Sequence, residues 1–184
     1  MPETLLTLQS DCKATIIPAG DEVVLPANTQ VELIQNLGGS LTVQRQGILY
    51  RIDQSETAHI DPKELEPLKP ETVAPPVDSG DFSESVLWET LKTCFDPEIP
   101  INIVDLGLIY DLTCQQASSG KQQVSVKMTL TAQGCGMGPV IAQDAQRKLE
   151  SLDAVESATV EIVWDPPWTP HMISPEGRIK LGIS

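Results

Sequence analysis

Residues 123–140 read QVSVKMTLTAQGCGMGPV, and within this stretch a strand pattern gives way to a helix pattern. Apolar residues occupy every second position from Val124 to Leu130, which is typical of a strand with one buried face. Pro139 suits the first turn of a helix, which we expect to run to Leu152. The stretch therefore predicts a strand and a helix joined by a loop in which three glycines surround one cysteine.

The segments on either side extend this pattern into a domain. Ser83 is placed to cap a first helix, and Asp96-Pro97 is expected to end it. A turn at 117–120 joins two strands into a hairpin. In chain order, the expected elements are a helix at 84–95, strands at 103–113 and 123–131, a helix at 139–152, a strand at 158–164 and a short helix at 175–181. This α-β-β-α-β order predicts an α+β sandwich in residues 83–184, with helices on one face of a small mixed sheet.

The N-terminal third of the chain has a different pattern, in which short β-type runs alternate with turn residues. The turns contain Pro, Gly, Asn and Asp and recur about every 8 to 10 residues. The expected strands are 14–17, 22–25, 30–34, 41–44 and 48–52. Residues 1–60 are therefore predicted to form a small all-β domain, a β-barrel or a β-roll.

Residues 61–82 contain five prolines and few large apolar side chains. Such a segment favours extended polyproline conformations and buries too little surface to fold by itself. We therefore expect a proline-rich linker between the two domains.

Composition narrows the classes of function. The formal charge is −14, and the 12 Lys and Arg residues are scattered, whereas nucleic-acid binding needs clustered basic residues. The sequence has neither an apolar run long enough for a membrane span nor the N-terminal pattern of a signal peptide. We expect a cytoplasmic protein without nucleic-acid or membrane partners, whose partners are proteins or cations.

The four cysteines, at positions 12, 94, 114 and 135, form no C-x-x-C pair and lack the spacing of a zinc or ferredoxin site. Thiol chemistry is therefore expected to use one cysteine at a time. Cys135 is the candidate, because its glycines admit a ligand and the following helix N-terminus favours a thiolate. The alternative is that Cys135 only fills a tight turn. Cys94 and Cys114 fit core positions better than reactive ones, and the sequence does not decide the role of Cys12.

The loop at 96–107 holds three carboxylates, those of Asp96, Glu98 and Asp105. Because its prolines stiffen the loop, these side chains could serve as oxygen ligands, polar anchors or a partner-facing edge. The alternative is structural: Asp96 ends the helix, and Asp105 binds nearby backbone amides.

Residues 164–171 read WDPPWTPH and form a third unusual loop. Trp164, Asp165 and Trp168 belong to a stiff aromatic segment, either a lid over the core or an exposed patch that binds a protein. His171 could lend a nitrogen ligand near the thiol, although a single histidine is more often a surface residue.

The sequence does not indicate an enzyme. Its two histidines, His59 and His171, fall in different predicted domains, and neither a Gly-x-Ser-x-Gly motif nor a phosphate-binding loop is present.

Three motifs, in the same order along the chain, carry a resemblance to a known family. They are DPEIP with NIVDLGLI (residues 96–109), the threonine-rich strand that ends at Cys135, and VWDPPW (residues 163–168). Together they resemble the iron–sulfur cluster assembly family that includes SufT, over residues 83–184. Gly136 differs from the proline that often follows the cysteine in relatives.

The resemblance implies an auxiliary factor in cluster maturation, without catalytic turnover. It places the family's reactive cysteine at Cys135 and its acidic loop at Asp96, Glu98 and Asp105. The β-rich N-terminal segment looks like the longer, SufT-type architecture.

Two functions from different classes follow. In the first, Cys135 is a transient ligand of iron or an iron–sulfur cluster, and the partners are scaffold or carrier proteins and client apoproteins. Because a cluster needs about four ligands, the others would come from a homodimer, a small thiol or a client. The isolated chain is therefore expected to bind a cluster transiently or not at all. In the second, the chain is an adaptor that links carriers to clients without binding metal.

Overall fold

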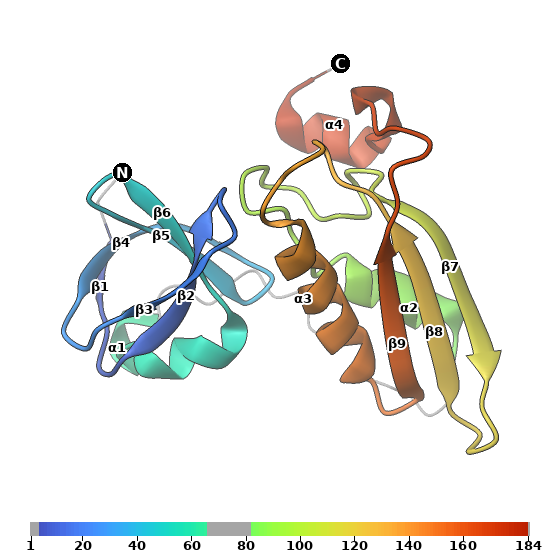
Figure 1. The fold of residues 1–184 in the computed structure, drawn as a ribbon, viewed down its shortest axis with the longest axis horizontal. Coiled ribbons are helices and arrows are strands. Elements are labelled where there is room, and N and C mark those ends of the chain that lie inside the picture. The colour runs from blue at the N-terminus through green and yellow to red at the C-terminus, as the bar shows by residue number, and fades with distance from the viewer. Residues whose placement is uncertain (1–3, 66–81, 184) are drawn as a thin grey trace. The chain divides into compact units, whose positions relative to one another are not determined.

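The computed structural model describes residues 4–65 and 82–183, and the chain divides into two compact units, Met1–Thr72 and Val73–Ser184 (Figure 1). Most of the expected linker, residues 66–81, lies outside the described residues. The first residues assigned to the linker are folded, however. They form the helical turn α1 (Pro62–Leu65), and Leu65 packs against the core of the N-terminal unit.

The N-terminal unit is an antiparallel sheet of six strands in the order β1-β4-β5-β6-β2-β3, curled around its core (Figure 1). Its elements are β1 (Thr4–Thr7), β2 (Cys12–Ile17), β3 (Glu22–Leu25), β4 (Gln30–Leu37), β5 (Ser40–Arg45), β6 (Ile48–Ile52), the 3-10 helix η1 (Gln54–His59) and α1. All five expected strands are present. β1 was not expected, because its four residues are too short to show alternation, and it forms by pairing with β4.

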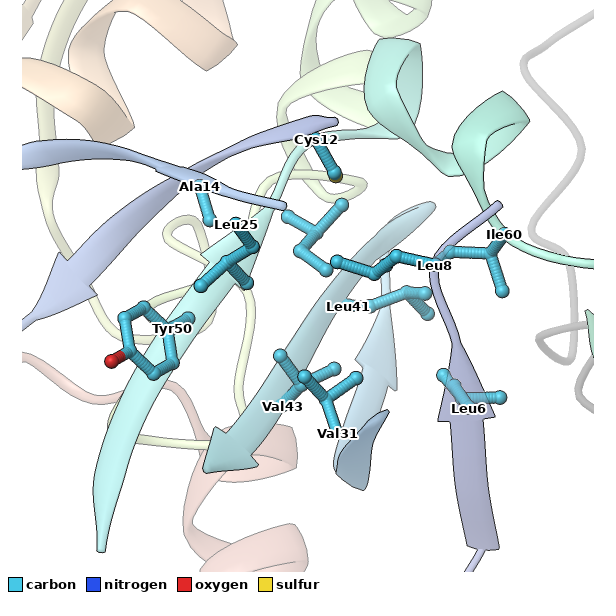
Figure 2. Packing of buried hydrophobic residues seen from close by; sticks show 11 residues of the cluster. Leu6, Leu8, Cys12, Ala14, Leu25, Val31, Leu41, Val43, Tyr50 and Ile60 are labelled. Carbon is cyan, nitrogen blue, oxygen red and sulfur yellow. The ribbon is translucent and has the colours of Figure 1, made fainter. Parts of the chain in front are cut away.

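The core of this unit is built from the inward-facing residues of the strands (Figure 2). Leu6 of β1 pairs in register with Val31 of β4, and both are buried. Cys12, which the sequence left open, lies fully buried in the same core. Its thiol is therefore a packing group.

The C-terminal unit is built on a three-stranded mixed sheet, β7-β8-β9. Its elements are α2 (Glu84–Leu91), β7 (Ile109–Gln116), β8 (Gln122–Met128), α3 (Gly138–Glu150), β9 (Val155–Ile162), the 3-10 helix η3 (Pro170–Met172) and α4 (Pro175–Leu181). β7 runs antiparallel and β9 parallel to the central strand β8. The predicted α+β class and the α-β-β-α-β order are confirmed.

One face of this sheet is apolar and covered, and the other is open. On β8, Val124, Val126 and Met128 are buried, while Ser125 and Lys127 between them are exposed. The helix α3 packs against β9 and α2. In the part of the chain that the structure describes, no helix combines the length and the apolar character needed to cross a membrane.

The first helix of this unit is shorter than predicted. α2 ends at Leu91 instead of residue 95, because the backbone then turns and the Ile103 N–H donates to the Cys94 carbonyl over 2.9 Å. Ser83 occupies the N-cap position, but its hydroxyl contacts the Ser85 hydroxyl and makes no capping hydrogen bond.

The three predicted strands also differ from the observed ones. The strand predicted at 123–131 is β8, which ends three residues early at Met128, so residues 129–131 belong to the loop. β7 begins at Ile109, because the residues before it form tight turns in which the Leu106 N–H donates to the Asn102 carbonyl and Gly107 has a φ of 71°. β9 begins earlier than predicted and ends at Ile162. Trp164 therefore belongs to the loop beyond the strand.

Candidate functional site

Three loops leave the same edge of the three-stranded sheet (Figure 1). In register, Ile109 at the start of β7 pairs with Met128 at the end of β8, and Met128 pairs with Ile162 at the end of β9. The strand directions therefore bring together the acidic loop (residues 96–107), the cysteine loop (residues 129–137) and the tryptophan loop (residues 163–171). The three motifs of the sequence share one edge of the fold.

Backbone hydrogen bonds tie these loops together at their bases. The Thr129 N–H donates to the Leu108 carbonyl over 2.8 Å, and the Val163 N–H donates to the Met128 carbonyl over 2.8 Å. These bonds continue the sheet ladder beyond the strands, so the loops start from a rigid platform.

Cys135 is partly exposed and lies two residues before Met137, the N-cap residue of α3. The Cys135 carbonyl accepts a hydrogen bond from the Gly138 N–H over 3.1 Å. Gly134 has a φ of 85°, which favours glycine, and a Cβ on Gly138 would lie 2.4 Å from Leu130 Cδ1. The glycines therefore serve a tight turn and a close helix start, and the thiol lies on that turn.

In the acidic loop, Asp96 is a structural residue. It is buried, and its Oδ1 accepts hydrogen bonds from the Glu98 N–H over 2.8 Å and the Ile99 N–H over 3.1 Å. This is the turn geometry in which aspartate binds its own backbone. The side chain of Glu98, in contrast, is exposed.

Asp105 is an anchor for the C-terminal segment. Its Oδ2 accepts hydrogen bonds from Asn102 Nδ2 over 2.8 Å and Lys180 Nζ over 3.2 Å, and its Oδ1 accepts one from the Ser174 hydroxyl over 3.1 Å. Burial by itself would raise the pKa of Asp105, but these hydrogen bonds outweigh it and hold the pKa below its ordinary value. The carboxylate is thus engaged by three neighbours.

The two tryptophans of the tryptophan loop differ in their exposure to solvent. Trp168 Nε1 donates to the Leu106 carbonyl over 2.8 Å, which fastens this loop to the acidic loop. Trp164 is 40% exposed. Asp165 and His171 are also exposed, and the His171 carbonyl accepts a hydrogen bond from the Arg178 guanidinium.

The site residues do not combine into a metal centre. In residues 4–65 and 82–183, no three His, Cys, Asp or Glu side chains are grouped as metal ligands. Cys94 is buried, and Cys114 lies on β7 five residues from the edge where the loops begin, about 16 Å along the strand. The structure joins the acidic loop to the tryptophan loop, and Cys135 stands apart from the other thiols.

Thr129, which begins the cysteine loop, is a residue that the sequence pattern did not single out. Its hydroxyl is fully buried and has no hydrogen-bond partner among the described residues. An unpaired buried hydroxyl costs about 1–3 kcal/mol, so such groups are uncommon in folded proteins. Its position in the strand pattern gave no signal, because the burial of a threonine becomes visible only in the fold.

Comparison with known proteins gives consistent matches. The model of a family described as iron–sulfur cluster assembly protein matches residues 84–162, which include the acidic and cysteine loops. An Fe-S protein maturation auxiliary factor of Porphyromonas gingivalis is 36% identical over 101 residues, 55% of this chain and 92% of that protein. The Fe-S protein maturation auxiliary factor SufT of Staphylococcus aureus is 40% identical over 89 residues, 48% of this chain and 97% of that protein.

A solved structure agrees with this match. The crystal structure of a domain of unknown function, DUF59, from Bacillus anthracis is similar with a TM-score of 0.50 and 34% sequence identity. The similarity covers 55% of this chain and 92% of that chain.

Proposed function

This chain belongs to the iron–sulfur cluster assembly protein family, and on that premise we propose that it is an auxiliary factor in the maturation of iron–sulfur proteins. Cys135 acts as a transient ligand of iron or of a cluster that passes to a client. The observation that carries the proposal is the position of this thiol, partly exposed on a glycine turn at the edge where the three loops meet.

The placement of the four cysteines fits a transient ligand better than it fits a permanently bound cluster. Common clusters take about four protein ligands, whereas Cys12 and Cys94 are buried and Cys114 lies far along β7. The other ligands therefore come from outside the chain, from a scaffold or carrier protein, from the client apoprotein or from a second copy. The cluster is cargo in this scheme, and no catalytic turnover is involved.

The decisive test uses Cys135→Ser, with Cys114→Ser as the matched control in the same unit. Cluster transfer from a loaded scaffold to a client apoprotein is followed under anaerobic conditions by visible absorption and by the client's activity. We expect the full chain and Cys114→Ser to accelerate transfer equally and Cys135→Ser to lose the acceleration while keeping its circular dichroism. Undiminished acceleration by Cys135→Ser would exclude a role for the thiol.

A second candidate is the adaptor function, which the exposure of Trp164 favours. Exposed tryptophans are frequent anchors of protein interfaces, and this one stands on the loop beside the acidic loop. An adaptor without metal chemistry predicts that Trp164→Ala abolishes the acceleration of transfer while Cys135→Ser retains it. The same transfer assay therefore separates the two functions.

A further inference from the structure

A pocket of about 650 Å³ opens where β7 and β8 meet the tryptophan loop, within the C-terminal unit. Its lining includes Ile109, Tyr110, Lys127, Val163, Asp165 and Met172. Cys135 is not part of the lining, and the inference drawn from this pocket does not rest on the role of the thiol.

The walls of the pocket suit the methylene groups of a long side chain. Ile109, Val163 and Met172 are apolar, and the Tyr110 hydroxyl is already engaged, donating to the Pro166 carbonyl over 2.8 Å. The same hydroxyl contacts Met172 Sδ over 3.6 Å, which fixes the ring as part of the wall. A long side chain that carries its polar group at the tip can bury its methylenes on such a surface.

The charges around the pocket are mainly negative. Lys127 lies in register between Asp111 on β7 and Glu161 on β9, and all three side chains are exposed. Neighbours across strands lie about 5 Å apart at Cβ, so two carboxylates compensate the single ammonium group. Asp165 is the carboxylate that lies on the pocket wall itself, and its side chain is exposed.

We propose that this pocket binds a basic side chain, an arginine, from a partner protein. The guanidinium pairs with the Asp165 carboxylate, and its methylenes pack on the apolar wall. Three carboxylates against one ammonium disfavour an anionic ligand here, and the chain's formal charge of −14 draws basic partners toward this surface. Arginine is also among the residues that most often anchor protein interfaces.

The test is a titration of the full, isotope-labelled chain with the peptide GKGRGKG, followed by NMR. The comparison peptide carries citrulline, which has nearly the same shape as arginine but no charge. We expect the arginine peptide to shift the amide resonances of Ile109, Tyr110 and Val163, and the citrulline peptide to bind at least threefold more weakly. No iron is present, so the result is independent of the proposed cluster transfer.

Three variants locate the binding, of which Asp165→Asn and its control Asp153→Asn change the charge equally. Asp165→Asn should weaken the arginine peptide by about two- to fivefold, as expected for one exposed ion pair, and Lys127→Gln should strengthen it. Asp153→Asn, which lies between α3 and β9 at the opposite edge of the sheet, should leave the affinity unchanged. Equal binding of the two peptides, absence of shifts at the pocket, or equal weakening by Asp153→Asn would each overturn the proposal.

Discussion

The carboxylate of Asp105 accepts a hydrogen bond from the hydroxyl of Ser174 over 3.1 Å and so joins two residues 69 positions apart. A second hydrogen bond joins the same two residues, because the Ser174 N–H donates to the Asp105 carbonyl over 2.8 Å. Gly177 in α4 lies so close that an added Cβ would be 2.9 Å from the same carbonyl. The acidic loop is thus the docking surface of the C-terminal segment, and Asp105 is its polar centre.

Acidification should weaken this docking. The lowered pKa of Asp105 means that its contribution to stability is present above about pH 4 and is lost as the pH falls through the folded-state pKa. We expect Asp105→Asn to lower the free energy of unfolding by about 1–3 kcal/mol at neutral pH, and by progressively less as the pH falls below about 4. Urea titrations over a pH series measure this, with the exposed Asp153→Asn as control. An equal loss at every pH would contradict the assignment.

Substitution of Gly107 should destabilise the protein by more than its positive φ alone explains. A Cβ at this position would lie 2.2 Å from the Met172 carbonyl, whereas Gly120, with a similar positive φ, has no atom within 4 Å of its added Cβ. We expect Gly120→Ala to cost about 1–2 kcal/mol from the φ angle alone and Gly107→Ala to cost at least about 1 kcal/mol more. Chemical denaturation of both variants measures the difference. Equal costs would mean that the close approach is relieved without strain.

Substitutions of the two tryptophans in the tryptophan loop should differ in their effect on the free energy of unfolding. Trp168→Phe removes the Nε1 hydrogen bond to the Leu106 carbonyl and leaves that carbonyl without this donor. We expect a loss of about 1–2 kcal/mol in the free energy of unfolding. Trp164→Phe, at a 40% exposed position, is the matched control and should change stability by less than about 0.5 kcal/mol. The assignment of Trp168 as a structural anchor fails if the two substitutions have equal effects.

The four thiols should react with iodoacetamide in a definite order. Burial, and then the Glu56 carboxylate, raise the pKa of Cys12 from 9.0 to about 11, which lowers its thiolate fraction about a hundredfold at a given pH. Cys94 is also buried, whereas Cys114 and Cys135 are partly exposed. Mass spectrometry of the native protein should find Cys135 and Cys114 modified well before Cys12 and Cys94. Early modification of Cys12 would show that the N-terminal core opens readily.

The regular part of the fold was predictable from the sequence. The alternation from Val124 to Leu130 and the proline at position 139 predicted a strand followed by a helix, and β8 and α3 confirm both. The short helix predicted at 175–181 is α4, and in the structure the Ser174 hydroxyl caps its start and Gly182, in the left-handed conformation, follows its end. Periodicity and cap residues are local signals, so the sequence alone carries them.

The acidic loop shows where local signals fail. The apolar residues at 103–108 read as a strand, yet they lie in turns that depend on Asn102 and Gly107. Ile103, Leu106 and Leu108 are buried there. Whether Asp105 serves as a ligand or as an anchor could not be decided from its neighbours in sequence. The donors from Ser174 and Lys180 come from a segment far along the chain.

The sequence by itself determined the α+β class and singled out, through the family motifs, the thiol of Cys135. Only the tertiary structure decided that Cys135 stands apart from the other cysteines, that Asp96 and Asp105 are occupied by hydrogen bonds, and that Trp168 packs while Trp164 is exposed. The physical reason is that a side chain's chemistry depends on its partners and its solvent access. Both are set here by strand directions that bring three separate loops to one edge of the sheet.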